Sequence, residues 1–302
     1  MVPSTENRPL VDISVVIPTF RRPKQLGEAI ASVLGQTGVV VEIIIIDDSP
    51  EASAQEIVEC VGDARVRYLK NPVPTGGVPS VVRNLGWPLA RGALIHFLDD
   101  DDIVPEGHYA AVKKIFFEHP EVGVVFGRIE PFGNAPEAQL RHERQFFDDA
   151  ARRALLCSRF GPKWAFTACM MFRRTLLICS AGILRRECVR RAGGFDPRIR
   201  IGEDAAFYAR AMRQCGAYFM DRVSLRFRVS NPSLMHSITP DQTEATQLSV
   251  ARKLTHDRYR AERGALEFYV LKALAYTVLR CHEAMIRRQV RTPGTSNFVS
   301  AA

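Results

Sequence analysis

Residues 93–102 read ALIHFLDDDD, a short apolar run that ends directly on four aspartates. A run of this length and composition is typical of a buried strand. Two similar runs come earlier, ISVVI at Ile13–Ile17 and VVVEIIII at Val39–Ile46, and the second ends on Asp47 and Asp48. The first half of the chain therefore predicts buried strands, two of which terminate in acidic residues.

Helical patterns separate these strands. Residues 24–34 place apolar side chains at helical spacing, and we expect further helices over residues 53–61 and 79–90 and a short strand over residues 66–69. This alternation predicts an α/β fold with a Rossmann-like, mostly parallel sheet and helices on both faces. Ligands bind beyond the carboxyl ends of such strands, which is where the acidic clusters stand.

The second half of the chain is less regular. We expect strands over residues 122–126, 176–184 and 217–229, and helices over residues 148–160 and 205–215. From Asp241 to about Val290 the pattern is helical and basic, and the last residues are typical of a loose tail. The predicted division is one α/β domain over residues 1–235 and a basic C-terminal helical extension with its tail over residues 236–302.

Composition narrows the class of protein. The 302 residues are 46% hydrophobic and 25% charged, as in ordinary globular proteins, and a net charge of +8 indicates anionic partners such as nucleotide phosphates, an anionic membrane surface or nucleic acid. Scattered cysteines without a CxxC pair are typical of reduced thiols. With no signal-peptide pattern and no apolar run of about 18 residues, we expect a cytoplasmic protein, soluble or peripherally attached to the inner face of the membrane.

The four aspartates at residues 99–102 have two interpretations. When all are ionised they repel one another unless a cation is present, and in extended backbone Asp99 and Asp101 would project to the same side. Such a carboxylate pair suits a hard divalent cation, Mn²⁺ or Mg²⁺. A solvated acidic turn is the alternative, but the position at the end of a strand favours a site.

Other charged segments also have a structural and a functional interpretation. Asp47 and Asp48 suit a turn or helix cap, or a nucleoside site in which a carboxylate accepts hydrogen bonds from base or ribose. Glu203 and Asp204 open a predicted helix, where the macrodipole favours acidic residues, or they take part in catalysis. The C-terminal arginines alternate with acidic residues, which favours solvated amphipathic helices, and we expect no nucleic-acid partner.

Taken together, five segments resemble family 2 glycosyltransferases of the GT-A fold. They follow the family's order from Ser14 to about Val229 and read SVVIPTFRR, ASVLGQT, IIIIDDSPE, GGVPSVVRNLGWPLARGALIHFLDDDD and RRAGGFDPRIRIGEDAAFYAR. The chain departs from the family at Ser49-Pro50, where Gly-Ser is usual. The resemblance implies that the α/β domain is a GT-A domain that binds a nucleotide sugar.

The resemblance also implies roles for single residues. Asp47 contacts the nucleobase, Asp101 binds the cation that bridges the two phosphates, and His236 is a further metal or phosphate contact. Asp204 is the general base, and Glu203 supports the acceptor side. The implied donor-binding residues are Pro18, Thr19, Phe20, Asp47, Asp48, Arg83, Asp99 and Asp100.

A single base opposite the leaving group implies inversion at the anomeric carbon. We expect transfer of one sugar from a nucleotide-diphosphate donor, with a UDP-sugar favoured, to a hydroxyl of a glycan, lipid-linked or small-molecule acceptor in polysaccharide, glycolipid or other glycoconjugate biosynthesis. A sugar nucleotidyltransferase or a non-catalytic nucleotide-binding scaffold of the same fold is the alternative. For the C-terminal region an acceptor role, a homodimer contact and docking on anionic lipid are open.

Overall fold

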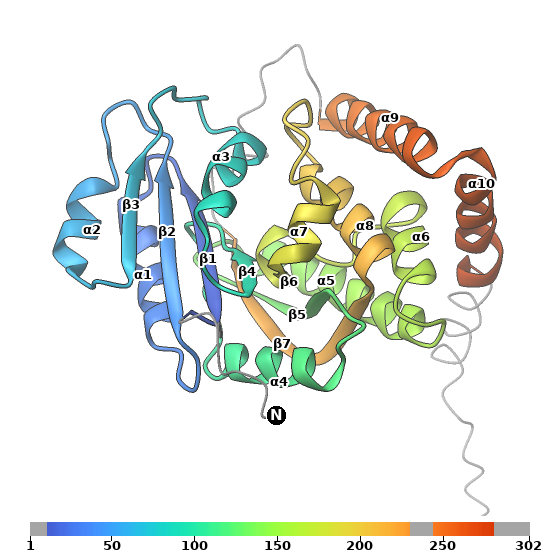
Figure 1. Cartoon of the computed structure of the whole chain (residues 1–302), viewed down its shortest axis with the longest axis horizontal. Coiled ribbons are helices and arrows are strands. Elements are labelled where there is room, and N and C mark those ends of the chain that lie inside the picture. The colour runs from blue at the N-terminus through green and yellow to red at the C-terminus, as the bar shows by residue number, and fades with distance from the viewer. Residues whose placement is uncertain (1–10, 230–243, 281–302) are drawn as a thin grey trace, which may run out of the picture.

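A seven-stranded sheet runs through the molecule. The computed structural model describes residues 11–229 and 244–280, and the strand order is β3-β2-β1-β4-β6-β5-β7. Strand β6 is antiparallel to both of its neighbours, and the other pairs in the sheet are parallel. Figure 1 shows helices around this sheet. The expected mostly parallel α/β sheet is confirmed.

The strands β1, β2 and β4 are short and their apolar side chains are buried, as the continuous apolar runs predict. The strands of the sheet are β1 (Ile13–Thr19), β2 (Val41–Asp47), β3 (Val66–Lys70), β4 (Leu94–Phe97), β5 (Val124–Phe132), β6 (Gly182–Arg185) and β7 (Ala217–Arg228). The α-helices are α1 (Pro23–Leu34), α2 (Gln55–Val61), α3 (Pro79–Gly86), α4 (His108–Glu118), α5 (Glu137–Ser158), α6 (Trp164–Phe172), α7 (Arg186–Ala192), α8 (Glu203–Cys215), α9 (Glu244–Arg263) and α10 (Ala265–Leu274).

Several elements differ from the sequence-based expectation. The strand expected over residues 176–184 is wrong for most of its length: residues 179–181 form a 3-10 turn, η2 (Cys179–Ala181), and β6 covers only Gly182–Arg185. Helix α5 begins at Glu137, well before residue 148. Helices α4, α6 and α7 were not expected. A buried apolar segment such as α6 has no polar face to reveal its helical period.

The order of the strands creates a switch point between β1 and β4. From β1 the chain adds β2 and β3 on one side and then returns to place β4 on the other. The crossover connections therefore diverge at the carboxyl ends of β1 and β4, which opens the usual ligand-binding crevice of an α/β sheet. Thr19 ends β1, and the acidic run at residues 99–102 follows β4.

Buried side chains tie this switch point to the second half of the chain. Phe97 of β4, Phe195 and Phe207 of α8 pack together, with ring centroids 4.9 Å apart for Phe97–Phe195 and 4.3 Å for Phe195–Phe207. The hydroxyl of Tyr208 donates to the carbonyl oxygens of Cys179 and Gly182. The start of α8 is thus held beside the end of β4.

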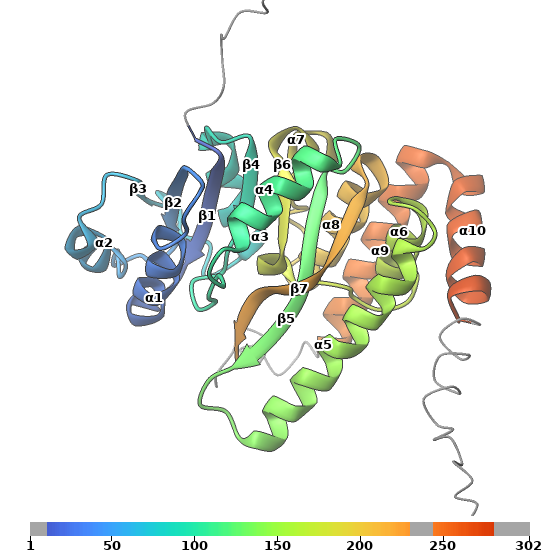
Figure 2. The ribbon, with the colours of Figure 1, turned by 90° about the horizontal axis from the view of Figure 1, so that it is seen from below.

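The C-terminal helices α9 and α10 pack on the second half of the sheet domain. Phe268 of α10 contacts Phe172 of α6 with ring centroids 5.1 Å apart, and Arg213 of α8 pairs with Glu267 at 2.8 Å. Figure 2 shows α10 at the end of the molecule opposite α2. A π-helical turn, η4 (Ala275–Leu279), continues α10. Among the described helices, none combines the length and apolar character needed to cross a membrane.

Candidate active site

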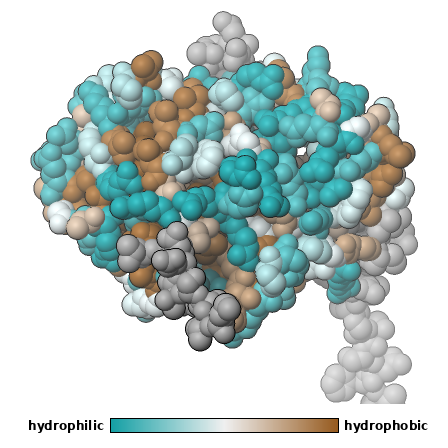
Figure 3. Space-filling model, viewed as in Figure 1, coloured by the Kyte–Doolittle hydropathy of each residue, from teal (hydrophilic) through white to brown (hydrophobic). Residues whose placement is uncertain are grey.

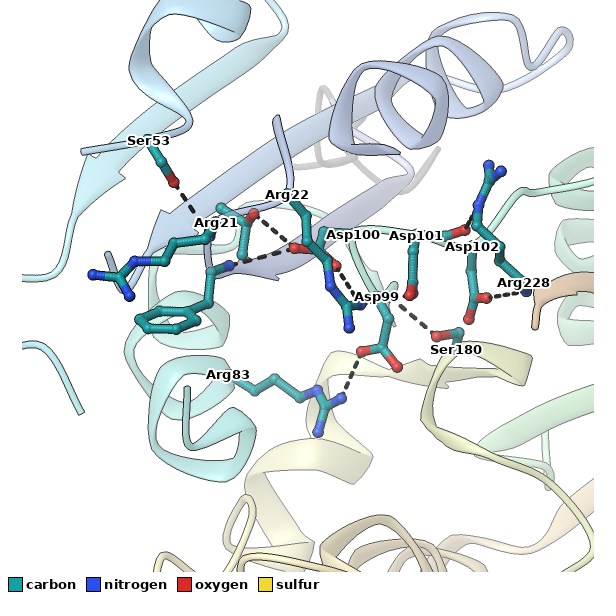
Figure 4. A network of polar contacts seen from close by, with 12 residues as sticks. Arg21, Arg22, Ser53, Arg83, Asp99, Asp100, Asp101, Asp102, Ser180 and Arg228 are labelled. Atoms are coloured by element: carbon teal, nitrogen blue, oxygen red, sulfur yellow. Dashed lines mark hydrogen bonds and ion pairs between the residues drawn. The ribbon is translucent and has the colours of Figure 1, made fainter. Parts of the chain in front are cut away.

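The acidic run after β4 forms a turn. The Asp102 N–H donates to the carbonyl oxygen of Asp99 at 3.3 Å, so the alternation expected for extended backbone at residues 99–102 does not apply. Each carboxylate has a partner within the chain, and Asp100 and Asp101 share Arg22 (Figure 4). Asp101 pairs with Arg22 at 2.5 Å, and Asp102 accepts from the backbone N–H of Arg228 at 3.0 Å.

Asp100 joins the carboxyl ends of β1 and β4. One of its oxygens accepts from the Thr19 hydroxyl at 2.7 Å and from the Phe20 N–H at 3.4 Å, and the other lies 3.4 Å from Arg22. Burial and the charge of Asp101 raise the pKa of Asp100 to about 7. Three of the residues expected to bind the donor, Thr19, Phe20 and Asp100, therefore meet at the switch point, and Pro18 lies next to them at the end of β1.

Arg83 connects the acidic turn to the start of α8. Its guanidinium donates to Asp99 at 2.6 Å and to Glu203 at 2.8 Å, and it lies 5.3 Å from the centre of the Phe195 ring. Only 3% of this residue is exposed. One buried cation therefore fixes two carboxylates that stand 104 positions apart in the sequence (203 − 99 = 104).

The neighbouring Asn84 holds the loop that leads into α8. Its amide accepts from the Phe195 N–H at 3.0 Å and donates to the Phe195 carbonyl oxygen at 2.8 Å. Gly194 makes this clamp possible, because its φ is +69° and a Cβ there would lie 2.6 Å from the Asn84 Oδ1. The Arg-Asn pair of α3 thus positions both ends of the GGFD loop region.

Asp204 differs from Glu203 in its partners. Its hydrogen bond with the described residues comes from the N–H of Ala205 at 2.6 Å, in the first turn of α8, whereas Glu203 is neutralised by Arg83. The surrounding protein, and then the charge of Glu203, raise the pKa of Asp204 to about 7. A carboxylate with this pKa can accept a proton near neutral pH.

Asp47 and Asp48 are buried and saturated by donors of the chain itself. Asp47 accepts from the N–H and hydroxyl of Ser49, from the Ala54 N–H and from the Tyr68 hydroxyl. Asp48 holds the loop at residues 71–77, with hydrogen bonds from Asn71, from the N–H and hydroxyl of Thr75 and from the Gly77 N–H. In this structure both carboxylates shape the loops beside β2.

The acidic turn offers oxygen ligands for a hard cation. In residues 11–229 and 244–280, no three His, Cys, Asp or Glu side chains form a group that could hold a metal ion by themselves. The carboxylate oxygens of the acidic turn fit Mg²⁺ or Mn²⁺ that is held by one or two carboxylates together with substrate phosphates and water. Burial raises the pKa of Asp101, and the charge of Arg22 opposes this rise. A cation at this site would therefore meet a carboxylate that is poorly solvated by water. His236 lies outside the described residues.

Several residues of the site were not found from the sequence. Arg22 and Arg228 both contact the acidic turn, and Ser180 accepts from the Asp99 N–H at 3.0 Å. The sequence does contain a signal for Arg22, because this residue follows the first strand closely, in the stretch PTFRR. Arg228 and Ser180 come from distant segments, and nothing in the local sequence predicts their contact with residues 99–102.

The model of "Glycosyl transferase family 2" matches residues 14–180, more than half of the chain. The chain belongs to this family. The family match covers the acidic turn and Arg83, and the expectation of a glycosyltransferase enzyme is confirmed.

Curated members of the family are similar to the chain over different lengths. The succinoglycan biosynthesis protein ExoO of Rhizobium meliloti (strain 1021) is 26% identical over 86% of this chain and 76% of its own length. The minor teichoic acid biosynthesis protein GgaB of Bacillus subtilis (strain 168) is 39% identical over 38% of this chain, but the match covers only 13% of GgaB. The UDP-Glc:alpha-D-GlcNAc-diphosphoundecaprenol beta-1,3-glucosyltransferase WfaP of Escherichia coli is 30% identical over 35% of this chain and 44% of WfaP.

Solved glycosyltransferase structures share the fold. S. aureus TarS 1-349 in complex with UDP aligns with a TM-score of 0.60 and 16% identity, covering 93% of this chain and 75% of TarS 1-349. The mannosyltransferase PcManGT from Pyrobaculum calidifontis, in complex with GDP-Man and Mn²⁺, aligns with a TM-score of 0.55 and 15% identity over 93% of this chain and 85% of PcManGT. The GT-A fold of this family 2 member is thereby confirmed.

Proposed function

We propose that this family 2 glycosyltransferase moves a sugar from a nucleotide-diphosphate donor, a UDP-sugar in the first place, to an acceptor hydroxyl with inversion at the anomeric carbon. The observation that carries the proposal is the Arg83 bridge. It fixes Asp99 of the acidic turn beside the start of α8, where Asp204 stands. This bridge supports the proposal, because the proposed donor-binding turn and the proposed base then lie on either side of one buried residue.

Asp204 is proposed to remove the proton of the acceptor hydroxyl. It is partly exposed, has no arginine partner among the described residues, and has a pKa raised to about 7. Glu203 is neutralised by Arg83 and is proposed to hold the acceptor side in place. A single base that faces the anomeric carbon from the side opposite the leaving group gives inversion.

The leaving nucleoside diphosphate is proposed to bind over the acidic turn. A divalent cation, Mn²⁺ or Mg²⁺, would offset the charge that develops on the leaving phosphate. Asp101 would hold this cation and Asp99 would approach the donor ribose or sugar, while His236 stays a prediction outside the described residues. Support comes from PcManGT, whose solved complex contains Mn²⁺.

The nucleoside is proposed to bind against Pro18–Phe20 and the loops that Asp47 and Asp48 hold. Both carboxylates already accept hydrogen bonds from the chain, so we propose that Asp47 positions Ser49 and that Asp48 positions residues 71–77. A direct contact of Asp47 with the base would require it to give up one of these hydrogen bonds. UDP is favoured because the TarS structures contain UDP and UDP-GlcNAc.

The acceptor is proposed to be a lipid-linked glycan in polysaccharide biosynthesis, because ExoO is a succinoglycan biosynthesis protein and WfaP is a glucosyltransferase for alpha-D-GlcNAc-diphosphoundecaprenol. Helix α10 offers a surface for an anionic membrane. Its outer face exposes Leu266 (81%), Tyr269 (56%) and Val270 (48%), and Lys272 is exposed beside them. Figure 3 shows hydrophobic residues gathered over α10, and an apolar helix face with aromatic and basic residues is typical of interfacial binding.

Thermal stabilisation tests the donor site. The protein is heated with UDP, GDP, dTDP or CMP, each with Mn²⁺ or with a chelator, and a ligand at 100 times its Kd should add about 2.7 kcal/mol. We expect a shift with one diphosphate that requires Mn²⁺ and disappears in Asp101→Asn. If no nucleotide shifts the transition, the proposed nucleotide-diphosphate site at the acidic turn is wrong.

Product analysis tests the reaction. With a donor identified, release of the nucleoside diphosphate and an inverted anomeric configuration by NMR are expected. Pyrophosphate release would instead favour a sugar nucleotidyltransferase, and a retained configuration would remove Asp204 from the role of base.

Flotation with vesicles that contain anionic lipid tests the α10 face: the wild type should float, and Leu266→Ser/Val270→Ser should not. Concentration-dependent dimerisation that is lost in the same variant would instead assign this face to a second copy. The proposed C-terminal extension, residues 236–302, would then serve as a dimer contact.

A further inference from the structure

Three arginines surround the acidic turn, and they differ in how firmly they are held. Arg83 is buried between Asp99 and Glu203. Arg228 donates to the Asp101 carbonyl oxygen at 2.8 Å, pairs with Glu28 and lies over the Phe132 ring. The Arg22 side chain instead forms ion pairs only with Asp100 and Asp101 in the described chain, and 23% of it is exposed.

Arg22 is therefore the cation that can leave. It stands between β1 and α1, at the N-cap position of α1, so its backbone is fixed while its side chain reaches across the switch point. Figure 4 shows the guanidinium directed toward Asp100 and Asp101. The Asp101 carboxylate that the proposed function assigns to a divalent cation is the one that Arg22 occupies.

We propose that Arg22 is an exchangeable internal counter-ion of this carboxylate: it neutralises Asp101 in the absence of donor and is displaced by the divalent cation, after which it pairs with the donor diphosphate. This inference rests on the proposed function, because it takes Asp101 as the metal ligand. The exchange conserves the charge balance, since the carboxylate gains the metal and the guanidinium gains the phosphate oxygens that arrive with it.

The exchange predicts that cation and nucleotide bind together. A metal alone must displace Arg22 and leave it with only the more distant Asp100, whereas a metal with a diphosphate provides Arg22 with a new partner. The cation should therefore bind weakly by itself and more tightly with UDP, and by linkage UDP should depend on the metal by the same factor. Removal of the Arg22 charge should strengthen the first step and weaken the second.

Electron paramagnetic resonance of free Mn²⁺ measures both steps on the full chain. Mn²⁺ is titrated into wild type and Arg22→Gln, with and without saturating UDP. Breaking one charge-assisted hydrogen bond corresponds to about tenfold in affinity. We expect Arg22→Gln to bind Mn²⁺ alone about tenfold more tightly than the wild type, and the factor by which UDP tightens Mn²⁺ binding to shrink about tenfold or more.

Controls separate exchange at Asp101 from a general change of charge. Arg21→Gln removes the same charge from the adjacent residue, whose side chain pairs with Glu51 and faces solvent, and it should leave Mn²⁺ binding within about twofold. Asp101→Asn should abolish the Mn²⁺ binding counted at this site. Arg22→Lys keeps the charge but offers a compact donor in place of a fork, so its affinity for Mn²⁺ should lie between those of the wild type and Arg22→Gln.

The outcomes distinguish this inference from the proposed function. Unchanged or weaker Mn²⁺ binding in both Arg22 variants overturns the counter-ion role, whether or not UDP binds. Tighter Mn²⁺ binding in Arg22→Gln with an undiminished effect of UDP overturns the transfer of Arg22 to the diphosphate. If the wild type binds Mn²⁺ at Asp101 but no nucleoside diphosphate, the proposed donor site fails, while the Mn²⁺-only titration still decides the pairing of Arg22 with Asp101.

Discussion

Arg83→Met should destabilise the fold by about 3 kcal/mol, because it removes the cation shared by two carboxylates and keeps an apolar side chain against Phe195. Loss of one partner of a buried ion pair costs about 3–5 kcal/mol. The lower value applies here, since Glu203 is buried but 35% of the Asp99 side chain is exposed and can be solvated. Most of the loss therefore comes from Glu203.

Urea unfolding followed by circular dichroism measures this loss, with the m-value as a check that the unfolded state is unchanged. Arg83→Met/Glu203→Gln should recover more than half of it, because the unpaired buried charge of Glu203 is then removed as well. Arg190→Met is the matched control. Like Arg83, Arg190 makes two hydrogen bonds to carboxylate oxygens, but both go to Glu187 and lie on the surface, so the loss should stay within about 0.5 kcal/mol. A loss for Arg83→Met as small as that of the control would refute a structural role of the bridge.

Three further results are expected. Asp204→Asn should lower turnover by about 100-fold or more while the stabilisation by UDP and Mn²⁺ is unchanged, and lost nucleotide binding would contradict a role as base. Because the pKa of Asp204 is raised to about 7, its base form disappears below that pH, so rates at saturating substrate should fall about tenfold per pH unit on the acid side; a flat profile down to pH 5 would exclude it. Gly194→Ala should destabilise the protein more than Gly161→Ala, since both glycines have positive φ but only the Cβ at residue 194 meets Asn84; equal losses of about 1–2 kcal/mol would show that φ alone matters.

The sequence predicts the first half of the fold well because its signals there are local. The apolar runs of β1, β2 and β4 each end on a proline or acidic residue, and the structure confirms their positions within a few residues. Residues 164–184 are mostly apolar, interrupted by Arg173 and Arg174, and nearly all of α6 is buried, which removes the periodicity that separates a helix from a strand. For this reason the sequence did not predict α6, and the strand that it predicted at β6 began too early.

The candidate site shows the same limit. Strand ends indicate the acidic turn and a helix start indicates Glu203 and Asp204, while the family resemblance adds Arg83 and assigns roles to these acidic residues. The structure supplies what no local pattern contains, namely that Arg83 pairs with both Asp99 and Glu203 and that Arg22 reaches across from β1. These contacts depend on the strand order β2-β1-β4, a long-range property of the chain.

The loop at residues 71–77 has a consequence for how tightly a nucleoside can be bound. Asp48 already fixes this loop through Asn71, Thr75 and Gly77, so its conformational entropy has been lost during folding. A ligand that binds against a preordered loop does not bear that cost again. Calorimetry of nucleotide binding should therefore give a small entropic penalty in the wild type and a larger one in Asp48→Asn, in which the loop becomes ordered only when the nucleotide arrives.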